Sequence, residues 1–197
     1  MHARHIDAAV ELHVNAFPDF FLTFLGDGFL KIFYQAYVEN CDAVAYVAEG
    51  KNGYLAGVVV GTLKPRGFFR RLLLRRWWSF ALACCGSAIK RPMIIPRLLR
   101  ALFYRGEEPT GVSRALLSSI AVAPAGQRTG AGRALMENWL NAVQAQGMLG
   151  AYLTTDANNN EAVNRFYQRF GWWIELTYVT REGRMMNRYV IDLRMRP

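Results

Sequence analysis

The sequence predicts one domain of the mixed α/β class, with α and β elements around a sheet of parallel and antiparallel strands. From residue 116 onward, apolar runs of strand length alternate with amphipathic helical stretches. This alternation is typical of a parallel strand pair joined by a right-handed crossover. Short β-rich runs also flank turns at residues 50–53 and 181–184, which predicts antiparallel hairpins. A chain of 197 residues that is 52% hydrophobic can bury one sizeable core.

Residues 6–39 are predicted to form two helices around a break at Pro18-Asp19. Eight aromatic side chains fall between Phe17 and Tyr37. They either pack in the core or line an acceptor pocket near the helix break. The second helix carries an apolar stripe at three- and four-residue intervals. Its members are Phe29, Ile32, Phe33, Ala36 and Tyr37.

The remaining elements follow from periodicity and from turn residues. A helix over 131–146 stacks Leu135, Trp139 and Val143 on one side, and Gly171 caps the helix over 161–170. Residues 64–106 form a basic insert with two short helices, the second opened by Pro96. Strands are expected at residues 43–49, 54–63, 116–122, 151–154, 173–180 and 188–193.

The positive charge of the chain is concentrated in one segment. The sequence has 24 Lys and Arg against 15 Asp and Glu, a formal charge of +9. Residues 64–105 hold 11 of these cations and no acid, so the rest of the chain carries 13 cations and 15 anions. Nucleic acid is not expected as a partner, because no recognised reading motif accompanies the charge.

Three interpretations of the basic segment remain. It is a solvated face of two packed helices, a site for the phosphates of an acidic acceptor, or a peripheral membrane contact. The membrane interpretation rests on Trp77, Trp78 and Phe80, which lie between cation pairs. The uncharged run 77–89 has thirteen residues, whereas a membrane-spanning helix needs about 20.

Cysteine and histidine usage predicts a chain without disulfides or a metal cofactor. The three cysteines are Cys41, Cys84 and Cys85, an odd number that fits a reducing compartment. No metal-ligand spacing joins them to the histidines. The N-terminus has no signal-peptide pattern. We therefore expect a cytoplasmic location, with the inner face of the membrane as the site of any peripheral contact.

The stretch 127–133 lies between a predicted strand and a predicted helix and is rich in glycine. Glycine allows sharp turns and a close approach of the backbone to a ligand. The following helix offers unpaired N–H groups and the positive end of its dipole. These features favour binding of a pyrophosphate, although an ordinary glycine-rich turn has the same composition.

Two motifs occur in order between residues 120 and 172. The first is Ile120-Ala121-Val122-Ala123-Pro124 followed by Gln127-x-x-Gly130-x-Gly132, which resembles the acetyl-CoA signature Q/R-x-x-G-x-G/A of the GNAT superfamily of N-acetyltransferases. About thirty residues later, 160–172 resembles the pattern N-x-x-A-x-x-x-Y-x-x-x-G-F, with Val163 in place of Ala and Trp172 in place of Phe. The resemblance is clear over about 116–172 and does not extend to the basic insert.

The resemblance implies a GNAT-like, splayed mixed β-sheet with flanking helices. It makes residues 1–197 one acetyltransferase domain, with a basic helical insert at about 64–106 expected between strands 3 and 4. It implies acetyl-CoA as co-substrate, with the backbone of Val122 on the pantetheine arm, Asn160 beside that arm and Tyr167 beside the sulfur. The residues implied around the pyrophosphate are Gln127, Arg128, Thr129, Gly130, Ala131, Gly132 and Arg133.

A general base is not evident, because the strand that carries the first motif reads Leu-Leu-Ser-Ser over 116–119, without a carboxylate. His13, Asp19 and Asp156 are candidates. Each also has a structural interpretation: His13 as a helix-surface residue, Asp19 as a helix cap and Asp156 as a turn residue. A water relay, or an amine that is already deprotonated, needs no dedicated base.

The resulting hypothesis is an N-acetyltransferase that moves an acetyl group from acetyl-CoA to a primary amine of a small molecule, such as an amino sugar or an envelope precursor. The amine attacks directly in a ternary complex, fixed N–H dipoles stabilise the oxyanion, and Tyr167 is the proton donor beside the thiolate. A non-catalytic acyl-CoA-binding or membrane-surface module is the alternative. Acetylation of protein lysines is a narrower third option. The oligomeric state stays open.

Overall fold

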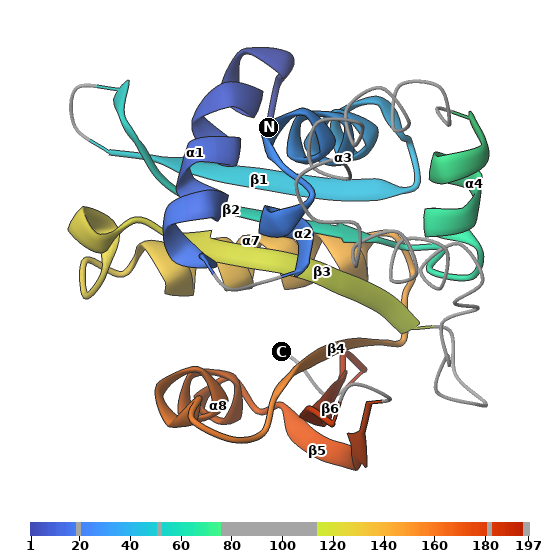
Figure 1. The fold of residues 1–197 in the computed structure, drawn as a ribbon. Coiled ribbons are helices and arrows are strands. Elements are labelled where there is room, and N and C mark those ends of the chain that lie inside the picture. The colour runs from blue at the N-terminus through green and yellow to red at the C-terminus, as the bar shows by residue number, and fades with distance from the viewer. Residues whose placement is uncertain (19–20, 51–52, 76–113, 181–182, 195–197) are drawn as a thin grey trace.

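The computed structural model describes residues 1–18, 21–50, 53–75, 114–180 and 183–194 (Figure 1). Most of the predicted basic insert, including the run 77–89 and the helix expected after Pro96, lies outside the described residues. The helices are α1 (Ile6–Ala16), α2 (Phe21–Phe24), α3 (Asp27–Glu39), α4 (Phe68–Arg75), α7 (Ala131–Ala145) and α8 (Glu161–Arg169). The strands are β1 (Ala43–Glu49), β2 (Leu55–Thr62), β3 (Arg114–Val122), β4 (Gly150–Asp156), β5 (Trp173–Val179) and β6 (Met185–Asp192).

The described strands form one mixed sheet in the order β1-β2-β3-β4-β6-β5. β3 and β4 are parallel, and the other neighbouring strands are antiparallel. The parallel pairing covers only Arg114–Leu116 against Gly150–Tyr152. Beyond this point β3 stays with β2, β4 stays with β6, and the two parallel strands move apart (Figure 1). The predicted splayed mixed sheet is therefore confirmed. In the described part of the chain the segment 64–106 follows β2 and precedes β3, so it separates the second and third strands rather than strands 3 and 4 as predicted.

Helices cover both faces of the β1-β2-β3 half of the sheet. On one face α1 and α3 pack on Val58 and Val60 of β2, and on the other face α7 packs near Val59 (Figure 1). Alternate residues of a strand point to opposite faces, so the uninterrupted valine run serves two cores. The helix packing thereby fixes where α7 begins relative to the end of β3.

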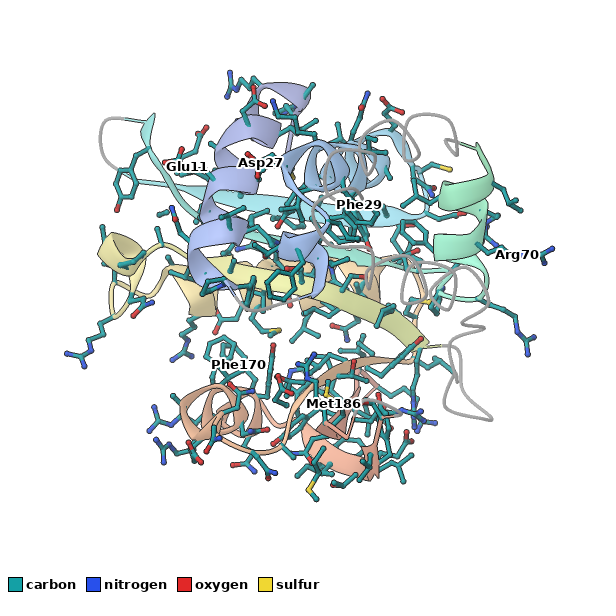
Figure 2. All side chains as sticks on the ribbon, viewed as in Figure 1. Glu11, Asp27, Phe29, Arg70, Phe170 and Met186 are labelled. Carbon is teal, nitrogen blue, oxygen red and sulfur yellow. The ribbon has the colours of Figure 1, made fainter. Side chains whose placement is uncertain are left out.

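The predicted helical stripes agree with the observed burial. Phe29 lies in the core beneath α3, whereas Arg70 extends from α4 into solvent (Figure 2). Leu135, Trp139 and Val143 of α7 are all buried, as predicted. The prediction of two N-terminal helices is wrong, because α2 forms a separate single helical turn between α1 and α3. β6 also begins at Met185 rather than at residue 188, because its pairing with β5 continues to the hairpin turn.

β3 contains a bulge at Ser118. Ser119 pairs with Val60 and Leu117 pairs with Gly61, so Ser118 has no counterpart in the register. A bulge adds one residue to a strand and changes the aim of the side chains beside it. The bulge therefore lies in the Leu-Leu-Ser-Ser stretch, on the part of β3 that has left β4.

The described part of the basic insert uses several of its cations for local structure. Lys64 forms an ion pair with Asp42 at 3.0 Å. Arg71 donates hydrogen bonds to the carbonyl oxygens of Arg66 at 2.7 Å and Lys64 at 3.3 Å. Among the helices of the described residues, none is long and apolar enough to cross a bilayer.

We predict that Gly126→Ala destabilises the fold. A Cβ at this buried position would lie 2.7 Å from the carbonyl oxygen of Ala56, which accepts a hydrogen bond from the amide of Ala123. Displacement of this backbone should lower the free energy of unfolding by about 1–3 kcal/mol, measured by urea denaturation. Gly132→Ala is the matched control, because its Cβ meets side chains at 3.3 Å or more. Equal losses in the two variants would contradict the packing described.

Candidate active site

The end of β3 leads to the first turn of α7 through a tight loop. The amide of Ala123 donates to the carbonyl oxygen of Ala56 at 2.9 Å, which ties the loop to β2. The amide of Gln127 donates to the carbonyl oxygen of Ala123 at 3.1 Å, and the Thr129 hydroxyl donates to the carbonyl oxygen of Gly126 at 2.7 Å. These bonds reverse the chain, so that α7 begins at Ala131, close to the end of β3.

Two residues of this loop have left-handed backbone conformations. Gly130 has φ +91° and Arg128 has φ +62°. Glycine adopts this region at no steric cost, whereas a residue with a Cβ stores strain there. Strained backbone is typical of functional sites, where the surrounding structure holds it in place. An ordinary glycine-rich turn does not need a non-glycine residue at positive φ, so the conformation of Arg128 distinguishes this loop from such a turn.

The electrostatics of the loop favour an anion. The first-turn amides of α7, at Ala131, Gly132 and Arg133, have no acceptor within the helix. No acidic residue occupies this first turn, so the positive end of the helix dipole is not neutralised locally. The guanidinium of Arg133 contacts Glu137 one turn later at 2.8 Å. The loop thus combines backbone donors, a helix dipole and two exposed arginines.

Helix α8 reaches the same end of the sheet. A Cβ built on Gly132 would lie 3.3 Å from the Val122 side chain and 3.7 Å from the ring of Phe166. The first turn of α7 therefore packs between the end of β3 and the residue that precedes Tyr167. The structure brings Val122, residues 127–133 and α8 together, and their roles toward a cofactor stay predictions.

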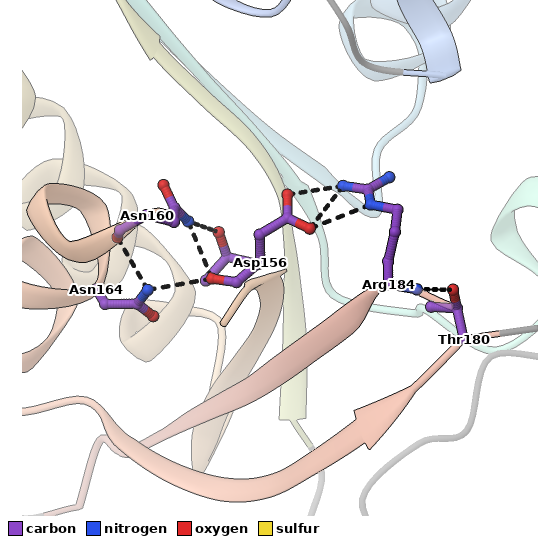
Figure 3. Close-up of polar contacts among 6 residues, drawn as sticks. Asp156, Asn160, Asn164, Thr180 and Arg184 are labelled. Carbon is purple, nitrogen blue, oxygen red and sulfur yellow. Dashed lines mark hydrogen bonds and ion pairs between the residues drawn. The ribbon is translucent and has the colours of Figure 1, made fainter. Parts of the chain in front are cut away.

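Asn160 lies at the N-terminal end of α8, where its side chain is held by two hydrogen bonds (Figure 3). Its Nδ2 donates to the Thr155 hydroxyl at 2.8 Å and to the carbonyl oxygen of Asp156 at 3.1 Å. Among the described residues, none donates a hydrogen bond to its amide oxygen. Asn160 thus has an oriented acceptor at the end of β4.

Tyr167 is 6% exposed and packs among other rings. Its ring centroid lies 5.5 Å from that of Phe166, 6.1 Å from that of Trp172 and 5.6 Å from that of Tyr189. Burial raises the pKa of the Tyr167 phenol well above its ordinary value, with a further contribution from Tyr189. Within the described part of the chain, its hydroxyl has no hydrogen-bond partner. The group is therefore a neutral hydrogen-bond donor at any physiological pH.

The structure removes two of the three candidate bases. His13 is 2% exposed, and the prediction that it is a helix-surface residue is wrong, because it packs against α3 with Nδ1 2.9 Å from the Tyr34 hydroxyl. Burial lowers the pKa of His13 to about 4, so its imidazole is a poor acceptor for the proton of an amine. Both carboxylate oxygens of Asp156 are bound by Arg184, at 2.7 and 2.8 Å (Figure 3). Asp19 lies outside the described residues.

Two site features were missed in the sequence analysis. Arg184, just before β6, contacts Asp156 at the end of the neighbouring strand β4, and Asn164 donates to the backbone of Asp156 and Asn160 (Figure 3). Asn164 follows Asn160 by four residues, so the helical repeat places both on one face. That four-residue spacing is the signal from which the role of Asn164 could have been predicted. The contact between Asp156 and Arg184 leaves no such local signal, because the two residues are 28 positions apart in the sequence.

A mixed sheet that opens between two parallel strands, with a glycine turn and a helix N-terminus at the opening, is the architecture of an acetyltransferase domain. The model of the acetyltransferase (GNAT) family matches residues 12–172. The chain therefore belongs to the GNAT family of acetyltransferases, which use acetyl-CoA. No curated protein sequence matches the chain significantly.

Solved structures share this fold over nearly the whole chain. SsHAT is 20% identical, with a TM-score of 0.67 over 98% of this chain and 96% of its own. Naa20 from Chaetomium thermophilum, in complex with a bisubstrate analogue, is 17% identical, with a TM-score of 0.61 over 98% and 85%. An aminoglycoside 6'-N-acetyltransferase in complex with coenzyme A is 13% identical, with a TM-score of 0.59 over 97% and 92%. At these identities the comparisons establish the fold.

We predict that His13 makes the fold sensitive to acid. Burial lowers its pKa in the folded state to about 4, from an ordinary value of 6.5, so the unfolded chain binds its proton first. This group should have no effect on stability above pH 6.5 and should cost up to about 3 kcal/mol as the pH falls toward 4. Urea unfolding of the wild type and of His13→Gln between pH 7 and pH 4.5 measures the difference. Parallel pH profiles of the two proteins would contradict the prediction.

Proposed function

We propose that this enzyme transfers the acetyl group of acetyl-CoA to a primary amine of a small molecule, by direct attack in a ternary complex. The observation that carries the proposal is the gap between β3 and β4, which has the N-terminus of α7 at its mouth. Among the described strands, none pairs in parallel with the six residues at the end of β3, although the backbone on that side has donors and acceptors. An extended cofactor arm can pair with such backbone groups.

The cofactor would be held along its whole length by this arrangement. The amides of residues 128–133 would bind the pyrophosphate, with Gln127 and Thr129 shaping the loop around it. The backbone of Val122 would hydrogen-bond the pantetheine arm, and the amide oxygen of Asn160 would accept from one of its N–H groups. The exposed side chains of Arg128 and Arg133 would add charge near the phosphates.

The proposed acetyl transfer depends on fixed backbone dipoles and on the phenol of Tyr167. As the amine nitrogen attacks the thioester carbonyl, negative charge grows on the carbonyl oxygen, and the amide at Val122 would stabilise it. When the tetrahedral intermediate collapses, the C–S bond breaks and the sulfur leaves as a thiolate. The raised pKa of Tyr167 keeps its hydroxyl protonated, so it would donate a hydrogen bond to that sulfur.

The acceptor must lose a proton before or during the attack. His13 is neutral and buried, and Asp156 is occupied by Arg184, so neither fits this role. We infer that the amine enters uncharged or passes its proton to water. Positive charge near the acceptor would lower the pKa of an incoming ammonium group.

The acceptor class is supported more weakly than the cofactor. An aminoglycoside acetyltransferase shares the fold, which fits a small-molecule amine such as an amino sugar or an envelope precursor. The cations of the basic insert fit an acceptor that carries phosphate, and a peripheral membrane contact would bring the enzyme to a lipid-linked one. In this proposal, residues 1–197 form one acetyltransferase domain.

The proposal is tested by incubating the full chain with acetyl-CoA and a panel of amines while free CoA is measured. The panel should include amino sugars, their nucleotide-linked forms, polyamines and lysine peptides. Release of CoA that depends on one small amine is the expected result. CoA binding without turnover on any amine would instead favour the acyl-CoA-binding module, and turnover on lysine peptides alone would make the substrate a protein.

We predict that Tyr167→Phe lowers kcat by about 10- to 100-fold and changes the Kd of CoA by less than about twofold. The substitution removes only the hydroxyl and keeps the buried ring, so the fold should persist. Tyr54→Phe is the matched control, because Tyr54 is 43% exposed in the β1–β2 hairpin. Steady-state kinetics and calorimetric titration measure the two quantities. Unchanged kcat in Tyr167→Phe would remove this phenol from the mechanism.

A further inference from the structure

The side-chain amide of Asn164 joins three elements behind the site. Its Nδ2 donates to the carbonyl oxygen of Asn160 at 2.9 Å and to that of Asp156 at 3.1 Å. Its Oδ1 accepts from the Tyr189 hydroxyl at 2.9 Å and from Nδ2 of Asn187 at 3.3 Å. One side chain of α8 is thus bonded to the end of β4 and to two residues of β6 (Figure 3 shows the β4 side).

These partners require a carboxamide in one orientation. The two groups that face Nδ2 are carbonyl oxygens, which accept, and the two that face Oδ1 are an O–H and an N–H, which donate. Exchange of the amide oxygen and nitrogen would oppose like groups at the two carbonyl oxygens and at Nδ2 of Asn187, and only the Tyr189 hydroxyl could turn to accept. A carboxylate would place a negative oxygen against two carbonyl oxygens, and an apolar side chain would leave buried polar groups unpaired.

The same bonds determine where Tyr167 lies. The Tyr167 hydroxyl has no hydrogen-bond partner among the described residues, so packing of its ring sets its position. Tyr189 is fully buried, and its ring packs against that of Tyr167 with a centroid distance of 5.6 Å. The Tyr189 hydroxyl is bonded to Asn164, which precedes Tyr167 by one turn of α8. Asn164 therefore controls Tyr167 both along the helix and through Tyr189.

We propose that Asn164 is a positioning residue for acetyl transfer. It holds the first turn of α8 to the end of β4 and fixes Tyr189 behind Tyr167, which sets the position of the Tyr167 hydroxyl. The inference rests on the proposed function, because Asn164 acts through Tyr167. Displacement of a reacting group by about 1 Å can cost up to about 100-fold in rate, so a residue without substrate contact can control kcat.

A double-mutant cycle on kcat tests the proposal. Asn164→Ala should lower kcat by about tenfold in the wild type and by less than about twofold in Tyr167→Phe, because the group it positions is then already absent. A purely structural role would lower kcat by the same factor in both backgrounds. Equal factors would therefore overturn the proposal, as would unchanged kcat in Asn164→Ala.

Two further variants separate positioning from loss of fold. Tyr189→Phe removes one hydrogen bond to Asn164 and keeps the ring, so it should fold and lower kcat by about threefold. Asn138→Ala is the matched control, because Asn138 donates to the carbonyl oxygen of Ala134 at 2.8 Å on the exposed side of α7. Full activity in Tyr189→Phe, with Asn164→Ala unfolded by thermal melting, would contradict the positioning role.

Failure of the proposed function would give a different result. In that case the wild type itself would release no CoA with any amine, and the positioning role would fall with it. Activity of the wild type together with unaltered kcat in every Asn164 variant would overturn the positioning role alone.

Discussion

The short parallel contact between β3 and β4 is the constraint on which the rest of the structure depends. Three residue pairs join the strands, after which each follows its own antiparallel neighbour. The sheet is thereby divided into a half built on β1-β2-β3 and a half built on β4-β6-β5. Over the last six residues of β3, the backbone that faces the gap pairs with no strand in the part of the chain that the structure describes. The N-terminus of α7 lies at this gap, which is the strongest physical argument for a bound cofactor.

The two halves are held by different interactions. In the first, α7 and α3 bury large apolar side chains against both faces of the valine run of β2. In the second, α8 places Tyr167 in the apolar core beside Tyr189, and the side chain of Asn164 adds hydrogen bonds that tie the mostly exposed helix to β4 and β6. Hydrogen bonds constrain angles as well as distances, so a polar attachment places α8 more narrowly than an apolar contact of the same size would. The half built on β4-β6-β5 carries Tyr167, whose hydroxyl needs an accurate position for its proposed role.

The fold could be predicted largely from local pattern, whereas the site could be predicted only in part. The stripe of α3, the packed face of α7 and the turn at Gly171 follow from periodicity and backbone preference, which act over a few residues. His13 was misjudged because its burial depends on Tyr34, 21 residues away. The Asp156–Arg184 pair was missed for the same reason. The two motifs gave the residues around Val122 and α7, but no local pattern specifies the bulge at Ser118.

We propose that the first turn of α7 and the end of β3 bind the phosphates and the arm of acetyl-CoA. The most direct measurement is a titration of the ¹⁵N-labelled chain with CoA, followed by the amide chemical shifts. We expect the largest changes at Val122 and at residues 128–133, with smaller changes at Asn160. Saturable binding that leaves those amides unmoved and shifts others instead, or no binding at millimolar CoA, would contradict the account.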